Sequence, residues 1–375
     1  DIYARALKVN AGLYANELKT VLGQNDISIQ DPSAPQIAKA ATGTNTTPQP
    51  DFALAVGQLG GMYAGKIYLV GTENGLGVRN AGSMNATTGQ LSLNANGDLI
   101  NTGNMIANKD QIAIQAQNIK NSGNISSTQH NIKITANNIQ NSGLIATNDE
   151  IQLNTQDKID NNNCVINAGR IDFTAQFLSN DKGKIEQTGQ QQLNISAKTL
   201  DNTQGLFGQA TKESSGTSGG TTTPSVTDPE QQSSAQDASK VEVAPVELTP
   251  KTFHAGNIQI AQGIGNVAGQ IVNNADINLK VQDSIKNNAG EIQLPELQFS
   301  GQNFENQQGK FTANVVNINA QNIDNQKGVI SASQSFDLTA QKLNNNQGRL
   351  QSGKAFNLTS TEIDLVILFE VLPTT

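Results

Sequence analysis

The chain contains 375 residues, of which 36% are hydrophobic, 4% aromatic and 15% charged, and it has no tryptophan. So few large apolar side chains argue against a thick globular core and favour a thin core that runs along the chain. The formal net charge of -8, without a cluster of Lys or Arg, argues against nucleic acid and anionic membrane surfaces as partners.

Residues 1–98 hold short apolar segments that alternate with polar residues, and we expect them to form the first coils of a stack. Residues 31–50 interrupt these segments with four prolines and a threonine-rich stretch, which is typical of a loop. The run KIYLVGT at 66–72 is the most β-prone stretch of the chain, and glycines on both sides of it indicate tight turns.

Residues 99–208 repeat one short pattern about every 20 residues. Apolar residues alternate with polar ones, and an asparagine and a glycine follow. Clear copies are Ile112, Ile114, Ala116, Ile119, Asn121 and Gly123; Ile132, Ile134, Ala136, Ile139, Asn141 and Gly143; and Leu193, Ile195, Ala197, Leu200, Asn202 and Gly205. A period of two predicts strands, and an interruption after about eight residues argues against helices.

A fixed period of this length indicates a repeat architecture, because one unit cannot bury its apolar face alone and must stack on its neighbours. Asn and Gly both tolerate positive φ, so we expect them at the corners, where the asparagine amides could pair from coil to coil. The fold class predicted is an all-β parallel β-solenoid. At about 4.8 Å per coil, about thirteen coils would form a rod of about 60 Å.

Residues 209–252 consist mainly of Ser, Thr, Gly, Pro and Gln, a composition that predicts a disordered, low-complexity linker. The repeat resumes in a second array at 253–363, where the glycine stands one residue further from the corner asparagine, as in Asn325 and Gly328. We therefore expect a longer turn there. Residues 364–375 lack the expected Asn and Gly, which predicts an atypical end: either a cap, or a chain that was cut or shifted out of frame.

Five acidic residues on neighbouring coils are candidates for catalysis: Asp149, Glu150, Asp157, Asp160 and Asp172. Parallel β-helices include polysaccharide lyases and hydrolases, which gather carboxylates, or a basic residue with calcium, on one exposed face. These acids could line one groove, but no Arg or His cluster accompanies them. Acidic side chains on a soluble rod also need no catalytic explanation, so we expect no enzymatic activity.

Other candidate sites are weaker. His130 and His254 lie more than a hundred residues apart, and the glycine-rich segments GGTTTP and GTENGLG lack the Lys-Ser/Thr of a phosphate loop. The single cysteine, Cys164, excludes an internal disulfide framework and is expected to be a small buried residue. The sequence therefore predicts no catalytic, cofactor-binding or metal-binding residues and no cofactor.

The chain shows no export or membrane signal of its own. No signal peptide opens it at Asp1, and the apolar run Ile363 to Leu372 is too short to span a membrane and carries Asp364 and Glu370. We expect no membrane span. Either the protein is cytosolic, or the ends of this sequence are not the ends of the mature product.

Two long N-terminal motifs carry a family resemblance. DIYARALKVNAGLYANELKTVLGQN at 1–25 and GGMYAGKIYLVGTENGLGVRNAG at 60–82 are followed by Asn-Ser-Gly repeats. Together they resemble the filamentous haemagglutinin family of bacterial two-partner secretion exoproteins, which includes the stick proteins of contact-dependent growth inhibition. The likeness extends to about residue 363, and it places the chain just after the secretion domain of such a protein.

The resemblance implies a right-handed parallel β-helix, exported by an outer-membrane two-partner secretion transporter and displayed at the bacterial cell surface. It implies contact with a host or neighbouring bacterial cell. The main hypothesis is a non-enzymatic shaft segment of a secreted adhesin. The alternatives are a stalk segment of a contact-dependent growth inhibition toxin-delivery protein and, third, a polysaccharide lyase. Family members begin with a signal peptide, and growth-inhibition members end with a toxic domain. We expect this chain to contain neither.

Overall fold

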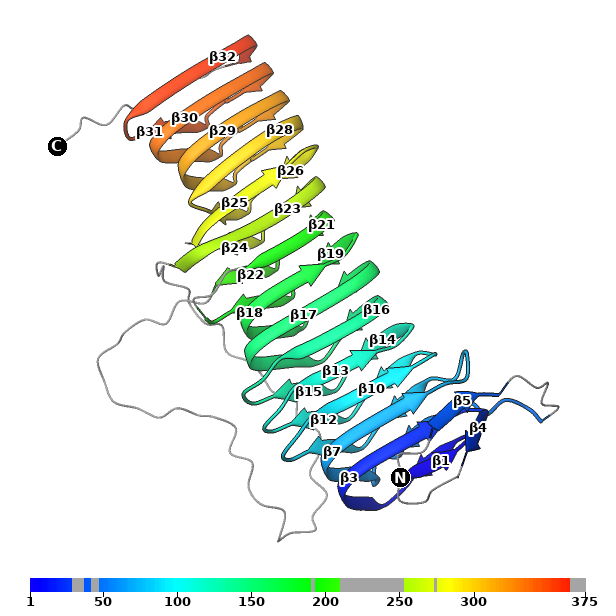
Figure 1. Ribbon diagram of the computed structural model, residues 1–375. Coiled ribbons are helices and arrows are strands. Elements are labelled where there is room, and N and C mark those ends of the chain that lie inside the picture. Colours follow the sequence, from blue (N-terminus) through cyan, green and yellow to red (C-terminus); the bar gives the residue numbers. More distant parts are fainter. Residues whose placement is uncertain (29–36, 42–46, 190–192, 210–252, 273–274, 365–375) are drawn as a thin grey trace, which may run out of the picture.

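The computed structural model describes residues 1–28, 37–41, 47–189, 193–209, 253–272 and 275–364. These residues form strands and turns without a helix, so none of them forms a helix that could cross a membrane. The strands wind into a parallel β-solenoid of about 14 turns with about 20 residues per turn, as the repeat predicted. Figure 1 shows a rod that runs from the N-terminal coils at one end to β32 at the other.

The strands stack in three parallel faces, and the longer strands bend from one face into the next. The first face contains β1 (Ile2–Ala4), β3 (Gly12–Leu22), β7 (Gly61–Gly71), β10 (Leu91–Ala95), β13 (Ile112–Gln115), β16 (Ile132–Asn141), β17 (Leu144–Asp160), β18 (Val165–Thr174), β21 (Asn194–Asp201), β23 (Phe253–Gly265), β25 (Ala275–Val281), β28 (Glu296–Glu305), β29 (Lys310–Asp324), β30 (Val329–Asn344) and β32 (Ala355–Asp364).

Shorter strands and parts of the long ones form the other two faces. The second face contains β2 (Leu7–Val9), β6 (Leu54–Val56), β8 (Val78–Asn80), β11 (Leu99–Asn101), β14 (Asn118–Asn121), β19 (Phe177–Ser179) and β26 (Ser284–Lys286). The third contains β9 (Ser83–Ala86), β12 (Asn104–Ala107), β15 (Asn124–Ser127), β20 (Lys184–Gln187), β22 (Leu206–Gln209), β24 (Gln270–Val272), β27 (Glu291–Gln293) and β31 (Arg349–Ser352).

A small antiparallel hairpin leaves the stack near the N-terminus. Strand β4 (Asn25–Ser28) pairs with β5 (Ile37–Ala40), so part of the expected 31–50 loop forms a strand. Residues 29–36 and 42–46 of this region lie outside the described residues, as do nearly all of the linker expected at 209–252 and of the atypical end expected at 364–375.

The core is a set of one-residue-wide columns inside the coils. Because alternate side chains of a strand point to opposite sides, the apolar set of each repeat faces inward. Ile119, Ile139 and Ile159 stack in register on consecutive coils and are at most 1% exposed. The same column continues through Ile264 and Ile323, so each coil buries its apolar face against the coils above and below it.

A ladder of buried asparagines follows one corner along most of the rod. In each step the side-chain Nδ2 donates to the Oδ1 of the next asparagine at 2.7–2.9 Å, and most also donate to a nearby backbone carbonyl. The members are Asn80, Asn101, Asn121, Asn141, Asn161, Asn180, Asn202, Asn266, Asn287, Asn306, Asn325 and Asn345. The amides satisfy one another in the interior, where an unpaired polar group is costly.

The two repeat arrays form one continuous stack. Asn202 donates to Asn266 at 2.8 Å, although 64 positions separate them in the sequence. Strand β21 pairs directly with β23, for example Ile195 with Ile258, so the coil before residue 209 lies against the coil after residue 253. The rod is therefore continuous across the segment between them.

The corner glycines are required for close approach and not for positive φ. A Cβ on Gly123 would lie 2.0 Å from the carbonyl oxygen of Gly103, and a Cβ on Gly328 would lie 2.0 Å from that of Asn306. Positive φ falls instead on the residue before the glycine in the longer corners, such as Lys327 at 56°. The interpretation of the corner Asn and Gly as positive-φ residues is therefore wrong, because the backbone of the coil below limits this space.

Candidate functional site

The five acidic candidates do not gather in one groove. Glu150 is buried, and its Oε1 lies 3.3 Å from Nη1 of Arg170. The same guanidinium lies 3.7 Å from Asp172, which also accepts a hydrogen bond from Asn194 at 3.3 Å. These two carboxylates are therefore held by one arginine and neighbouring amides.

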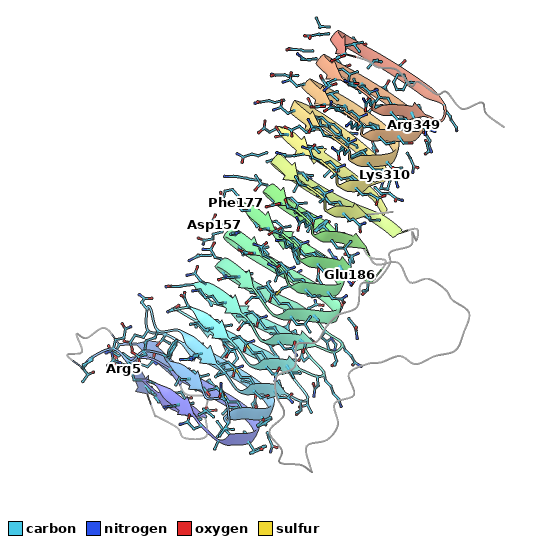
Figure 2. The ribbon with its side chains drawn as sticks, turned by 180° about the vertical axis from the view of Figure 1, so that it is seen from behind. Arg5, Asp157, Phe177, Glu186, Lys310 and Arg349 are labelled. Carbon is cyan, nitrogen blue, oxygen red and sulfur yellow. The ribbon has the colours of Figure 1, made fainter. Side chains whose placement is uncertain are left out.

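Asp149, the chain neighbour of Glu150, is half-buried, and the other two acids lie further along the coil. Asp160 accepts a hydrogen bond from Lys158 at 2.8 Å, next to the asparagine ladder. Asp157 is exposed, on the edge of the rod that carries Phe177 and away from Glu186 (Figure 2). Ten positions of strand separate Glu150 from Asp160, a path of about 30 Å along an extended chain. The structure brings Glu150 and Asp172 together through Arg170 and leaves Asp157 and Asp160 apart from them.

The histidines and the cysteine are not drawn into a common site. The backbone of His130 lies in a turn, donating to Ser127 at 3.2 Å and accepting from Thr147 at 2.7 Å. Cys164 is partly buried at a corner, and burial raises the pKa of its thiol. His254 belongs to β23, on another coil. Across the described part of the chain, no group of three or more His, Cys, Asp or Glu could hold a metal ion.

An ion pair fixes the hairpin end of the rod. Arg5 donates from Nε and Nη2 to the two oxygens of Glu73 at 3.1 and 2.9 Å, and the backbone N–H of Gln24 also donates to Glu73 at 3.1 Å. The hydrogen bonds from Arg5 lower the pKa of Glu73 below its ordinary value, and burial partly offsets this. This charge pair ties the first strands to the coil above them.

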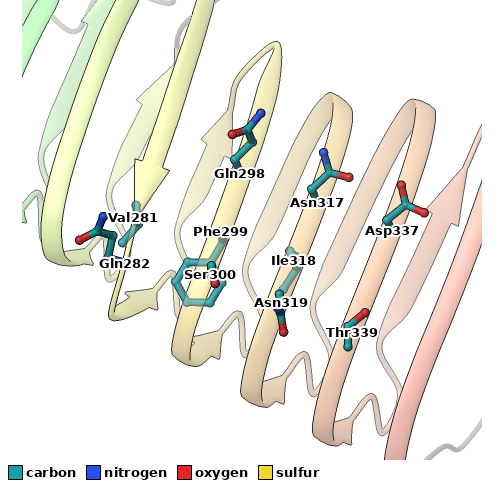
Figure 3. A pocket seen from close by; sticks show the side chains of 10 residues that line it. All are labelled: Val281, Gln282, Gln298, Phe299, Ser300, Asn317, Ile318, Asn319, Asp337 and Thr339. Atoms are coloured by element: carbon teal, nitrogen blue, oxygen red, sulfur yellow. The ribbon is translucent and has the colours of Figure 1, made fainter.

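A hollow in the described surface lies on the outer side of the first face, over the C-terminal coils. A groove of 470 Å³ crosses β25, β28, β29 and β30 (Figure 3). Its polar lining comes in two rows of outward side chains, and the buried Val281, Phe299 and Ile318 lie beneath it. The first row is Gln298, Asn317 and Asp337, and the second is Gln282, Ser300, Asn319 and Thr339.

The groove continues along the rod. An adjoining hollow of 430 Å³ shares Ser300, Asn319 and Thr339 and extends to Thr359 on β32. A third, of 310 Å³, shares Gln282 and reaches back to Ser196 on β21. We call these three hollows together the axial groove, because neighbouring strands contribute equivalent side chains to it along the rod.

A longer bend in the strands accompanies the groove. Two buried columns flank this bend: one contains Ile134 and Val316, and the other contains Ile139 and Ile323. In the earlier coil the two columns are five positions apart along the chain, from Ile134 to Ile139. In the later coil they are seven apart, from Val316 to Ile323. The two additional positions place Asn319 and Gln321 on the outside, with the small Ala320 inside. The spacing of the sequence motif did not reveal this groove. Val316 occupies the place of Ile132 in the repeated pattern, but in the structure it stacks in the same column as Ile134.

Sequence comparisons relate the chain to large bacterial toxins. It is 43% identical over 114 residues to Toxin CdiA of Yersinia pestis, 46% identical over 103 residues to tRNA nuclease CdiA-2 of Burkholderia pseudomallei, and 37% identical over 100 residues to 16S rRNA endonuclease CdiA of Enterobacter cloacae. The chain is similar to the CdiA proteins. The matches cover 30%, 28% and 27% of this chain.

The matched residues span 3% of the length of each of these three relatives. No family model matches it, and no solved structure matches it. The similarity and the solenoid together support a relationship to CdiA and filamentous haemagglutinin-like proteins.

The names of the CdiA relatives contradict the expectation that the protein is not an enzyme. Two are called tRNA nuclease CdiA-2 and 16S rRNA endonuclease CdiA. The expectation rested on the lack of a catalytic cluster in 375 residues, which are a small fraction of such a polypeptide. The absence of a catalytic cluster from a repeat segment therefore does not exclude enzymatic activity.

Proposed function

We propose that the chain is a shaft segment of a CdiA-like protein of contact-dependent growth inhibition, the alternative among the functions considered from the sequence. The observation that carries this proposal is the 43–46% identity to Toxin CdiA and tRNA nuclease CdiA-2. These names favour the toxin-delivery function over the adhesin function. On this proposal the whole protein acts on neighbouring bacteria and carries a nuclease or another toxic activity.

The solenoid suits a shaft. Each coil advances the rod by about one inter-strand spacing, so length grows in proportion to the number of repeats. The asparagine ladder and the apolar columns connect every coil to the next across the described stack, including the step from Asn202 to Asn266. Export by a two-partner secretion transporter and display at the cell surface belong to the same proposal.

Competition between bacteria tests this function. A strain that carries the complete gene is grown with target cells that lack the matching immunity protein, either mixed or separated by a membrane filter. We expect loss of viable targets only in the mixed culture, and a frameshift in the gene should abolish it. Equal survival with the intact and the frameshifted gene, or killing across the filter, would contradict the proposal.

A second arm tests the part played by this segment. Deletion of residues 307–325 removes one coil and rejoins Asn306 to the turn that follows Asn325, because the two asparagines occupy the same corner. We expect export and target killing to continue with this shorter shaft. Deletion of residues 307–316 removes half a coil and should abolish surface display. If display survives the half-coil deletion, the segment is not a stacked shaft.

A further inference from the structure

The axial groove presents hydrogen-bonding groups that the protein leaves unused. Ser300, Asn319 and Thr339 are exposed, and no hydrogen bond from their side chains is formed within the described part of the chain. By contrast, Asn303 and Asn322, on two of the same strands at the other side of the bend, bond to each other at 3.0 Å. These three side chains are therefore available to a ligand.

The spacing of these groups favours an extended polymer that lies along the rod. Ser300 pairs in register with Asn319, and Asn319 with Thr339, so equivalent groups recur at each inter-strand step of about 4.8 Å. An extended peptide repeats at about 3.3 Å per residue and would fall out of step with these strands. A pyranose unit in a linear polysaccharide has a length close to one such step.

The charge of the groove argues against a polyanionic ligand. Its lining is made of amides and hydroxyls, with Asp337 as the one charged side chain among the residues that form the hollows. That carboxylate accepts a hydrogen bond from Asn357 on the next coil. Among the described residues that line the hollows there is no Lys or Arg to attract a polyanion, whereas sugar hydroxyls both donate to and accept from amides and hydroxyls.

We propose that the axial groove binds a neutral, linear polysaccharide, with about one sugar unit opposite each coil from β25 to β32. Gln282, Ser300, Asn319, Thr339 and Thr359 supply the hydrogen bonds, one strand after another. The buried Phe299 and Ile318 lie beneath them. This inference rests on the groove alone and holds whether or not the protein delivers a toxin.

Binding of defined oligosaccharides to the purified 375-residue chain tests the proposal. A panel of neutral linear oligosaccharides of glucose, mannose and galactose, from disaccharide to hexasaccharide, is titrated calorimetrically. We expect at least one series to bind, with affinity that rises with length and levels off near about five units, the number of strands crossed. A heparin fragment and an extended glutamine-rich peptide are titrated in parallel.

Matched variants locate the site. The groove variant combines Ser300→Ala, Asn319→Ala and Thr339→Ala, and the control combines Asn303→Ala, Asn322→Ala and Lys342→Ala on the same three strands. The groove variant should bind the best oligosaccharide about tenfold more weakly, and the control about as tightly as the unchanged chain. Circular dichroism and melting temperature confirm that both variants fold.

Three results would overturn the proposal. The first is that no neutral oligosaccharide binds the folded chain. The second is that the heparin fragment or the peptide binds and the neutral sugars do not. The third is equal loss of sugar binding in the groove and control variants, which would place the site elsewhere. None of these results bears on growth inhibition, so the groove and the shaft function can fail separately.

Discussion

The rod contains two kinds of corner, and their comparison separates what the solenoid requires from what it allows to vary. From Asn80 to Gly143 the corners read Asn-x-Gly, whereas from Asn180 to Gly348 they read Asn-x-x-Gly and contain a residue at positive φ. Both kinds keep the buried asparagine and its hydrogen bond to the next coil. The amide ladder is therefore constant, and the length of the turn behind it is free to change.

Cys164 marks the change between the two kinds of corner. It stands where every later described corner has a glycine, and its backbone N–H donates to Asn161 at 3.3 Å, as that of Gly183 donates to Asn180 at 3.0 Å. The coil below it still has the short corner that ends at Gly143. A side chain is accommodated here because the two stacked turns differ in length.

Of the changes predicted here, removal of half a coil should destabilise the stack most. Deletion of residues 307–316 in the purified chain shifts the inward set of every later strand out of its column, so the C-terminal coils should unfold. Deletion of residues 307–325 keeps the asparagine register and should preserve a cooperative transition. Thermal denaturation followed by circular dichroism distinguishes the two. Similar melting of both deletions would show that column register does not hold the stack together.

Substitution of a corner glycine should cost nearly the same in both regions. Gly123→Ala and Gly328→Ala each place a methyl group 2.0 Å from a carbonyl oxygen of the coil below. We expect each to lower the free energy of unfolding by about 3 kcal/mol. Urea denaturation measures this, with Cys164→Ala as a control of about 1 kcal/mol or less. A small effect at either glycine would mean that the stacked corners can move apart.

Removal of a ladder asparagine should be less damaging than a glycine substitution. In Asn121→Ala and Asn306→Ala, one neighbour loses its acceptor and the other loses its donor. Leaving buried amides unpaired costs about 2 kcal/mol. Urea denaturation should give similar losses for the two variants, and a value near zero for exposed Asn319→Ala. A loss confined to one region would show that the ladder has different importance in the two kinds of corner.

The positive-φ position distinguishes the two kinds of corner most directly. Lys327 has a φ of 56°, a conformation that asparagine tolerates better than lysine, and Asn163 occupies the equivalent place with a φ of 60°. Lys327→Asn should therefore raise the free energy of unfolding by about 0.5 kcal/mol. Ser122→Asn, in a short corner without positive φ, should give no gain. Equal gains at both positions would rule out backbone conformation as the cause.

The sequence predicted the features that recur within every coil and missed those that depend on how one coil contacts the next. Alternation identified the inward set, including Ile132, Ile134 and Ile139, and the repeated asparagine identified the ladder. The reason for the corner glycines was not visible, because it depends on the carbonyl of another coil. The axial groove was missed because a repeat motif fixes which residues point inward but not which columns stack.

Acid should affect the hairpin end and leave both corner types unchanged, because the ladder is built from amides that do not titrate. Arg5 lowers the pKa of Glu73, so the carboxylate stabilises the folded state at pH values above its ordinary pKa of 4.5. This contribution is lost as pH falls through the lowered folded-state pKa. The pair is partly exposed, so the effect should be the smallest of those predicted here. Glu73→Gln should melt below the unchanged chain at pH 7, and the two melting temperatures should converge once the pH falls below the lowered pKa of Glu73. A difference that persists at low pH would assign the stabilisation to packing of the Glu73 side chain and not to its charge.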